Sequence, residues 1–330
     1  MHAAPARTFP WLRLGAAVAI VSWLARHAGV ESLAQHYART DWLLLAAALA
    51  LMLGDSLAKA WNWRKLIASL VTDRDVAFVR VMSWYFAGGF LGAVLPSSAS
   101  TDVLRAYLSQ RALGGHGAAC AASVLTLNGV GWMAGSLLGL TGIGLLALGR
   151  SLPTLLGPAA LLFVAMAVIL PAGYRVVSIQ RSRLRGLLCG SRWPAVGATL
   201  RRFIDAVCVF ECAHVRFLQF LVVAISGLLA QAGMYALTAM SIGVYLPFAV
   251  WMILAPLTRV IALVPLSVLD FGLIQGAHVA ILSLFGVSYA ESFVISTLFA
   301  LQGAFIHATA GSLAFVFGGY RVPAGARQAS

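Results

Sequence analysis

The sequence predicts an all-α, polytopic integral membrane protein with about six to eight transmembrane helices, and three observations support this class. Residues 217–258 contain no Asp, Glu, Lys or Arg. At about 1.5 Å per residue this tract reaches roughly 63 Å, enough for two crossings of a hydrocarbon core about 30 Å thick. The chain is 61% hydrophobic and only 10% charged, whereas soluble domains carry about 25% charged residues. Its 23 basic residues gather in short segments beside apolar tracts, which is the positive-inside pattern.

The uncharged tracts predict the spans in order along the chain. Residues 14–25, extended by 10–13, indicate a retained signal anchor, because no small-residue cleavage site follows them. A polar helix is expected from Asp102 to about Leu113, ending at Gly114-Gly115. The remaining apolar segments are 42–63, 81–101, 117–149, 152–174, 217–258 and 292–317. We expect one transmembrane domain over 1–330, with halves 1–150 and 151–330 as a pseudo-repeat.

The basic residues predict the orientation. Nineteen of them fall on one side if that side holds the amino terminus, the carboxyl tail and the segments 59–80, 102–117 and 175–216, the last a basic cytoplasmic loop. Arg26, Arg39 and Arg150 then lie on the other side. This count requires 81–113 and 248–286 to enter the membrane and return, as two re-entrant broken-helix hairpins. We therefore expect a multi-pass protein of the bacterial inner membrane with both termini in the cytoplasm.

The first predicted break carries the main candidate site. Pro96 ends one half-helix, and a cluster of hydroxyl side chains supplies caps for the next. A helix start presents unpaired N–H groups to an anion, and the planar fork of Arg105 suits a phosphate. Asp102 either takes part or only caps the helix and pairs with Arg105. The candidate substrate-binding residues here are Ser97, Ser98, Ser100, Thr101, Asp102 and Arg105.

The second predicted break, around Pro265, resembles the first in its short Leu/Val-Pro-x-Ser pattern. Paired broken helices in corresponding halves indicate a substrate site near the middle of the membrane in transporters. Arg259 and Asp270 either line the substrate path or neutralise each other, and Gln275 could donate hydrogen bonds to a substrate. Elsewhere, Asp55 and Lys59 look like a local ion pair near the cytoplasmic end of their span, and His278 is expected to pack.

Composition also excludes several functions. The basic residues border apolar tracts, so nucleic acid is not an expected partner. The four cysteines do not form a disulfide framework. Cys208, Cys212 and His214 beside Glu211 have a weak resemblance to a metal site, but packing is the expected role. No acidic pair beside a histidine and no HExxH motif is present, so we expect no metal, no cofactor and no enzyme activity.

At these residues the chain resembles the transmembrane flippase region of the lysylphosphatidylglycerol synthases and its free-standing relatives. The resemblance rests on the Leu95-Pro96 segment through Asp102 and Arg105, on the Ala-Ser-Val-Leu run at 122–125, and on a late segment of Pro265, Ser267, Gly272, Gly286 and Val287. It implies lipid translocation without the aminoacyl transfer that a separate domain performs in the synthases. Ser100 and Thr101 replace a usual Gly pair, Leu127 and Asn128 an acidic–Arg pair, and Gln275 a Glu, which favours a different lipid.

The leading hypothesis is a flippase-like carrier for an anionic phospholipid or an isoprenoid-derived lipid, with the headgroup at a helix N-terminus near Arg105. Two alternatives stay open: an accessory subunit of a lipid or envelope pathway, and an integral-membrane enzyme acting on a lipid phosphate. The expected partners are membrane lipids, and both a homodimer and a lipid-biosynthesis enzyme partner remain options.

Overall fold

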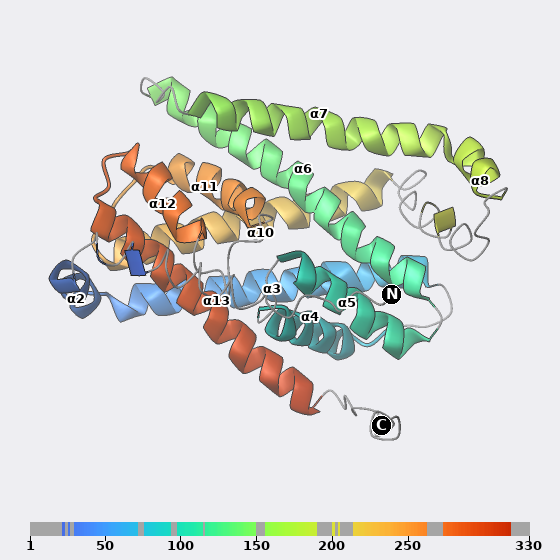
Figure 1. Cartoon of the computed structure of the whole chain (residues 1–330), viewed down its shortest axis with the longest axis horizontal. Helices are drawn as coiled ribbons and strands as arrows, with labels where there is room; N and C mark the ends of the chain where they lie inside the picture. The colour runs from blue at the N-terminus through green and yellow to red at the C-terminus, as the bar shows by residue number, and fades with distance from the viewer. Residues whose placement is uncertain are drawn as a thin grey trace, which may run out of the picture.

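The computed structural model describes residues 22–23, 26, 30–71, 76–93, 98–114, 116–149, 156–189, 200–201, 204, 214–262 and 273–317. Within these ranges the chain is helical and contains no strand. The helices, shown in Figure 1, are α2 (Val30–Ala38), α3 (Trp42–Leu70), α4 (Phe78–Ala93), α5 (Ser98–Leu113), α6 (Gly117–Gly149), α7 (Gly157–Ile179), α8 (Arg181–Cys189), α10 (His214–Ser241), α11 (Phe248–Ile261), α12 (Leu273–Ser283) and α13 (Tyr289–Phe317).

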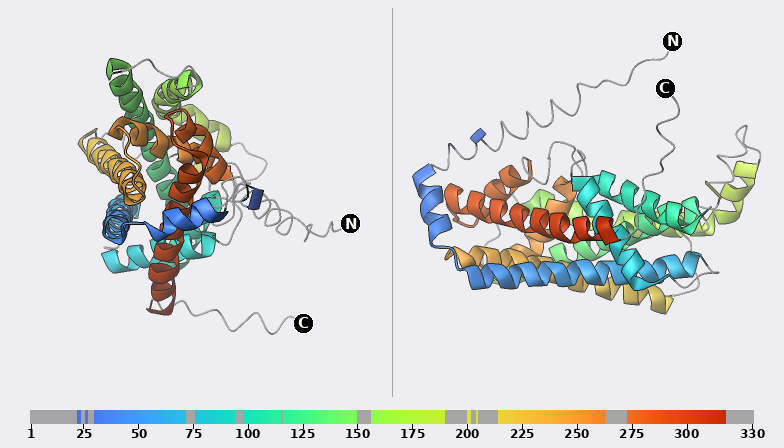
Figure 2. Two further views of the ribbon diagram at one scale, coloured as in Figure 1. Left: turned by 90° about the vertical axis from the view of Figure 1, so that its left-hand side faces the viewer. Right: turned by 90° about the horizontal axis from the view of Figure 1, so that it is seen from below.

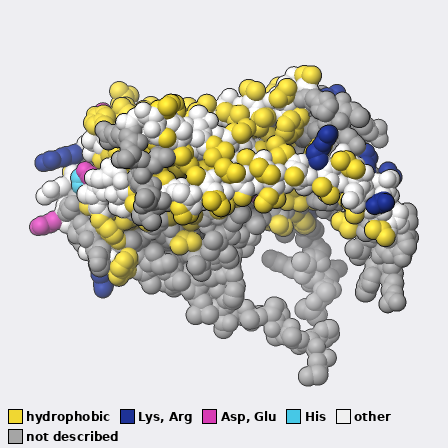
Figure 3. Space-filling view, turned by 90° about the horizontal axis from the view of Figure 1, so that it is seen from above, with side chains coloured by type: hydrophobic (Ala, Val, Ile, Leu, Met, Phe, Trp, Pro, Cys, Tyr) yellow, Lys and Arg dark blue, Asp and Glu magenta, His cyan; other side chains and the backbone are white. Residues whose placement is uncertain are grey.

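Five of the described helices are long and apolar enough to cross a membrane: α3, α6, α7, α10 and α13. The fold class predicted from the sequence is therefore confirmed. A broad band of hydrophobic side chains covers the face seen in Figure 3, and Lys and Arg lie toward its ends. The span expected at 14–25 lies outside the described residues, apart from isolated positions.

Short helices stand at both places where re-entrant hairpins were predicted. Helices α4 and α5 have 16 residues each, and α11 and α12 have 14 and 11. At about 1.5 Å per residue none exceeds roughly 24 Å, which is less than a hydrocarbon core of about 30 Å. The predicted breaks at 94–97 and 263–270 fall outside the described residues. The 217–258 tract therefore forms one long helix, α10, and most of a short one, α11, and does not make two full crossings.

Three predicted boundaries were wrong, two of them because a charged residue ends an apolar tract without ending the helix. Helix α3 continues past Trp63 to Leu70, since Leu66 and Ile67 remain buried while Lys65 points outward. Helix α5 begins at Ser98 and not at Asp102. Helix α7 spans Gly157–Ile179 and not 152–174, with a proline in its first turn.

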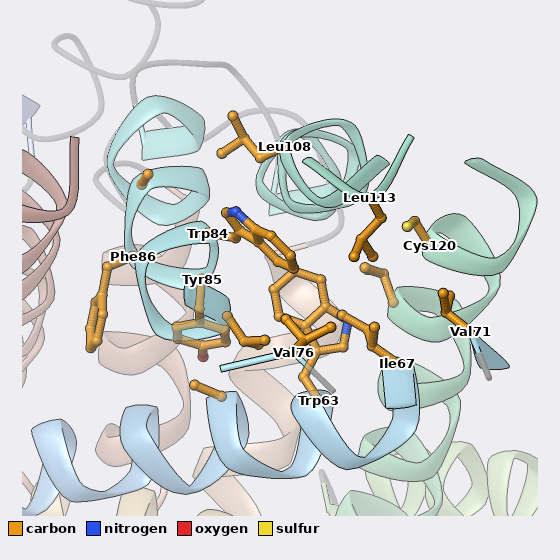
Figure 4. Packing of buried hydrophobic residues seen from close by; sticks show 14 of the residues in the cluster. Trp63, Ile67, Val71, Val76, Trp84, Tyr85, Phe86, Leu108, Leu113 and Cys120 are labelled. Atoms are coloured by element: carbon orange, nitrogen blue, oxygen red, sulfur yellow. The ribbon is translucent and has the colours of Figure 1, made fainter. Parts of the chain in front are cut away.

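A buried aromatic cluster joins the end of α3 to the α4–α5 pair. Trp63 and Trp84 meet edge to face with ring centroids 6.3 Å apart (Figure 4). The indole nitrogen of Trp63 donates a hydrogen bond of 2.9 Å to Ser123 on α6, within the Ala-Ser-Val-Leu run. This contact fixes the position of α6 against α3, because a buried indole N–H without a partner would be costly. The rest of the cluster includes Ile67, Val76, Tyr85, Leu108 and Leu113.

Helix α11 lies at the centre of the other half, with residues 249–256 all buried. It packs against α6 and α10, and α3 lies alongside α10 (Figure 2). In contrast, α7 lies at the edge of the bundle (Figure 1), and Phe163 is its one buried residue. Most of α7 is thus free to face lipid.

Candidate functional site

The α4–α5 hairpin is closed by two glycines of α4. A Cβ added at Gly88 would lie 2.6 Å from Cγ of Arg105, and one added at Gly92 would collide with Thr101. The contact moves forward along α4 as it moves backward along α5, so the two helices are antiparallel. Only glycine at these positions lets α5 approach closely enough for Arg105 to lie on α4.

Arg105 is held flat against α4. Its guanidinium carbon lies 3.8 Å from the centroid of the Tyr85 ring, and its Nε donates to the Tyr85 carbonyl oxygen at 3.3 Å. Nη1 donates to Oδ1 of Asp102 at 3.4 Å, a long contact for a charged pair. The side chain is 15% exposed. Stacking and one backbone bond therefore fix the guanidinium plane and leave donor capacity on its outer edge.

Asp102 connects this hairpin to α6. Its Oδ2 accepts a hydrogen bond of 2.7 Å from Nδ2 of Asn128. Because α5 begins at Ser98, Asp102 lies in the second turn and does not cap the helix, which corrects one of the two roles considered for it. The ion pair with Arg105 is present. The sequence analysis noted Asn128 only because the family usually has a charged residue there. In the structure Asn128 is a hydrogen-bond partner of Asp102.

Of the other residues predicted for the first break, the structure describes some and not others. Ser100 and Thr101 are half-buried in the first turn of α5, and Thr101 faces Gly92. Ser98 begins the helix, but its side chain lies outside the described residues, as does the whole of Ser97. The start of α5 is thus one to two turns from Arg105.

Arg259, from the second break, reaches the same helix as Asp102. Its Nη1 lies 3.3 Å from the position of a Cβ added at Gly131, about one turn along α6 from Asn128. Arg259 also borders a pocket between α6, α7 and α11, lined by Trp132, Ser136, Phe163, Met166, Pro256 and Val260. The two predicted regions therefore meet along one stretch of α6. Asp270 lies outside the described residues, and Gln275 is fully buried on α12.

A further charged pair lies partly buried on α3. Lys59 and Asp55 form an ion pair of 2.5 Å between Nζ and Oδ2. Since α3 continues to Leu70, this pair lies near the middle of a 29-residue helix and not near its cytoplasmic end, which corrects the placement made from sequence. Oδ1 of Asp55 faces Gly227 on α10 and is buried without a hydrogen-bond partner among the described residues.

His307 on α13 is a further polar residue inside the bundle, although sequence analysis did not single it out. Its ring fits against Gly89 of α4, and its Nδ1 is buried with no hydrogen-bond partner in the described part of the chain. Arg105 packs on the adjacent Gly88, so the two side chains meet the same turn of α4. A histidine inside an apolar span is the sequence signal that could have drawn attention to it.

His278, in contrast, belongs to an aromatic layer. It is fully buried, its Nδ1 lies 2.7 Å from the Ile274 carbonyl oxygen, and its ring packs 5.2 Å from Tyr235 and 6.2 Å from Phe299. These contacts agree with the packing role expected for it. Among the described residues, no three His, Cys, Asp or Glu side chains converge as a metal site would require. Cys208 and Cys212 lie outside those residues.

Comparison with known protein families decides what this bundle is related to. A family model described as the lysylphosphatidylglycerol synthase TM region matches residues 11–311. The chain belongs to this family. No curated protein and no solved structure gave a match. Membership in the lysylphosphatidylglycerol synthase TM region family, together with five long apolar helices, makes this a multi-pass membrane protein with a lipid-related function.

Proposed function

We propose that this protein is a flippase-like carrier that moves a lipid between the two leaflets of the bacterial inner membrane. The lipid is an anionic phospholipid or an isoprenoid-derived lipid with an anionic headgroup. The headgroup binds near Arg105, toward the N-terminal end of α5, while the hydrocarbon chains stay in the bilayer. In this proposal both chain termini lie in the cytoplasm, where the basic segments concentrate anionic lipid.

The observation that carries the proposal is the setting of Arg105. An arginine within the membrane-embedded part of a protein is expensive and normally marks a substrate path. Here the guanidinium is stacked on Tyr85 and pairs with Asp102 over a long 3.4 Å contact. A phosphate oxygen pair would offer it a shorter, two-point contact of the kind that guanidinium groups prefer.

The two short-helix pairs supply the means of movement. No helix of either pair is long enough to span the bilayer alone, and each pair contacts α6, at Asn128 or at Gly131. Small shifts of the α4–α5 and α11–α12 pairs along α6 expose the headgroup first to one leaflet and then to the other. Packed helix pairs of this kind can have two stable positions that differ by a small sliding movement.

The test is lipid movement in liposomes that contain the purified protein and a fluorescent phosphatidylglycerol. Arg105→Ala is expected to lower the rate at least tenfold, and Arg105→Lys to recover only part of it, because a lysine lacks the planar fork. Arg111→Gln is the matched control, since Arg111 is exposed in the last turn of the same helix. Equal rates for the wild type and Arg105→Ala would refute the carrier and favour an accessory role.

A further inference from the structure

Arg259 is a positively charged side chain of α11 without an acidic partner among the described residues. Asp55 with Lys59 and Asp102 with Arg105 form ion pairs, so the charges of those four side chains cancel. Arg259 makes no hydrogen bond or ion pair in the described part of the chain. A lone charge at membrane depth is costly. An anion bound beside the guanidinium would remove that cost.

The contact with α6 places this charge deeper than Arg105. Asp102 is 11 residues from the end of α5 and Asn128 is 11 residues from the start of α6, and a hydrogen bond joins them, so the two helices are level. On this scale Arg105 lies about 12 Å and Gly131 about 21 Å from the α5–α6 connection, at about 1.5 Å per residue. Nη1 of Arg259 lies 3.3 Å from the position of a Cβ added at Gly131, near the midpoint of α6.

The pocket beside Arg259 offers a second hydrogen-bond donor. Trp132 of α6 borders this pocket, and its indole N–H has no hydrogen-bond partner among the described residues. Arg259 and Trp132 are both half-buried, and none of their nitrogens is among the fully buried atoms that lack a partner. The Ser136 hydroxyl donates to the Trp132 carbonyl oxygen at 2.9 Å. The donors of Arg259 and Trp132 are therefore open to a ligand in the pocket.

The remaining walls of the pocket are apolar. Phe163 and Met166 come from α7, and Pro256 and Val260 come from α11. Helix α7 lies at the edge of the bundle (Figure 1), so the hydrocarbon of the bilayer lies close to the pocket. The pocket is shallow and partly open. It therefore suits a headgroup that lies against Arg259 while the hydrocarbon chains stay outside the bundle.

We propose that Arg259 and Trp132 form a second phosphate site, at which the headgroup of the transported lipid rests near the middle of the membrane. This inference rests on the proposed function and adds a binding site to the one near Arg105. The guanidinium donates to two phosphate oxygens, and the indole N–H donates to a further oxygen of the headgroup. The ligand is a lipid phosphodiester with one net negative charge, because that charge balances Arg259. A headgroup at this depth has left the interface of its leaflet, so the site holds a lipid in transit.

A photoreactive headgroup locates the site. The full-length protein is reconstituted in liposomes that contain a small fraction of a phosphatidyl lipid with a diazirine in its headgroup alcohol, and labelled peptides are mapped by mass spectrometry after illumination. We expect label on α4–α5 peptides beside Arg105 and at Met166, roughly 14 Å along α7. Val168, an exposed residue of α7, is the positional control and should carry none, because headgroups of the surrounding bilayer stay at its interfaces. Equal label at Met166 and Val168 would overturn the site.

Two arginine variants separate this inference from the carrier itself. Arg259→Gln is expected to lower the label at Met166 by about tenfold and to leave the α4–α5 label unchanged. Its melting temperature should not fall, because the side chain has no described partner to lose. Undiminished label at Met166 would refute the second site. Arg105→Gln should lower the α4–α5 label instead; no change there would refute the proposed headgroup site and leave the Arg259 site standing.

A neutral variant and competing ligands test the chemistry of the site. Trp132→Phe keeps an aromatic ring but removes the N–H, and should lower the label at Met166 by about fivefold without altering any charge. Equal label in this variant would exclude Trp132 from the site. Unlabelled phosphatidylglycerol should compete for Met166. Equal competition by phosphatidylcholine would overturn the requirement for net negative charge, and competition by inorganic phosphate would overturn a lipid as the ligand.

Discussion

At the scale of single residues, the site depends on partners that reach across helices. Arg105 and Asp102 were predicted from a local motif because a Pro-hydroxyl-Asp-x-x-Arg sequence carries its own chemistry. Tyr85 and Asn128, which hold them, come from α4 and α6, and their sequence neighbours give no sign of this. Which residue faces Asp102 depends on how the helices are aligned after packing, and a single sequence does not specify that alignment.

Asn128→Leu tests the cross-helix bond. The substitution keeps the side-chain volume similar. It removes the amide group that donates the 2.7 Å hydrogen bond to Asp102, so one carboxylate oxygen loses its partner. We expect a loss of about 1–3 kcal/mol in stability, seen as a lower melting temperature in detergent. Lipid movement should also slow, because Asp102 then pairs more closely with Arg105. Leu125→Ala, at an exposed position of α6, is the control; an equal decrease in both variants would show that Asn128 has no special role.

At the scale of helices, α6 is the element that organises the bundle. Gly131, Gly135 and Gly139 recur every four residues and face Arg259, Pro256 and Phe163, on α11 and α7. Small residues at this spacing let helices pack closely where no hydrophobic effect drives them together. The sequence predicted α6 at Gly117–Gly149, as observed, because no charge interrupts it. Its partners were not predicted, since a glycine stripe marks an interface without naming the helix opposite.

Gly139→Ala should separate α6 from α7. An added Cβ at this position would collide with the buried ring of Phe163. We expect a destabilisation of roughly 1–3 kcal/mol from overpacking, measured by thermal unfolding in detergent. Gly144→Ala on the same helix has open space around it and is expected to be neutral or to gain up to about 1 kcal/mol from helix propensity. If the two variants unfold at the same temperature, the Gly139 contact does not support the bundle.

At the scale of the whole molecule, charge bias predicts the orientation. The turn after α10 and the start of α3 lie together, since Asp41 N–H donates to the Ser241 carbonyl oxygen at 2.7 Å. We expect this end to face away from the cytoplasm. In a cysteine-free background, Tyr245→Cys should react with an impermeant maleimide from outside intact spheroplasts, and Ala68→Cys only after lysis. The reverse pattern would invert the orientation and with it the assignment of the basic loop.

The fold class and most helices could be predicted from the sequence, because a transmembrane helix needs an apolar tract long enough to cross the hydrocarbon core. Helix ends did not follow, as α3 and α7 show, because a charged residue that ends an apolar tract can still continue the helix. Depth was misjudged for the same reason: the early end assigned to α3 put Lys59 at the surface. His307 was missed since a lone histidine carries no motif, and only packing places it against Gly89, next to the glycine that Arg105 contacts.

Helix α6 has 33 residues and a length of about 50 Å, well beyond the hydrocarbon thickness of a typical bilayer. A helix this long leans to keep its apolar surface covered, and the lean grows as the membrane thins. Because both short-helix pairs contact α6, at Asn128 and Gly131, we expect their depth in the membrane to change with that lean. We therefore expect the acyl-chain length of the surrounding lipids to change how deep the site lies, without any lipid binding to it.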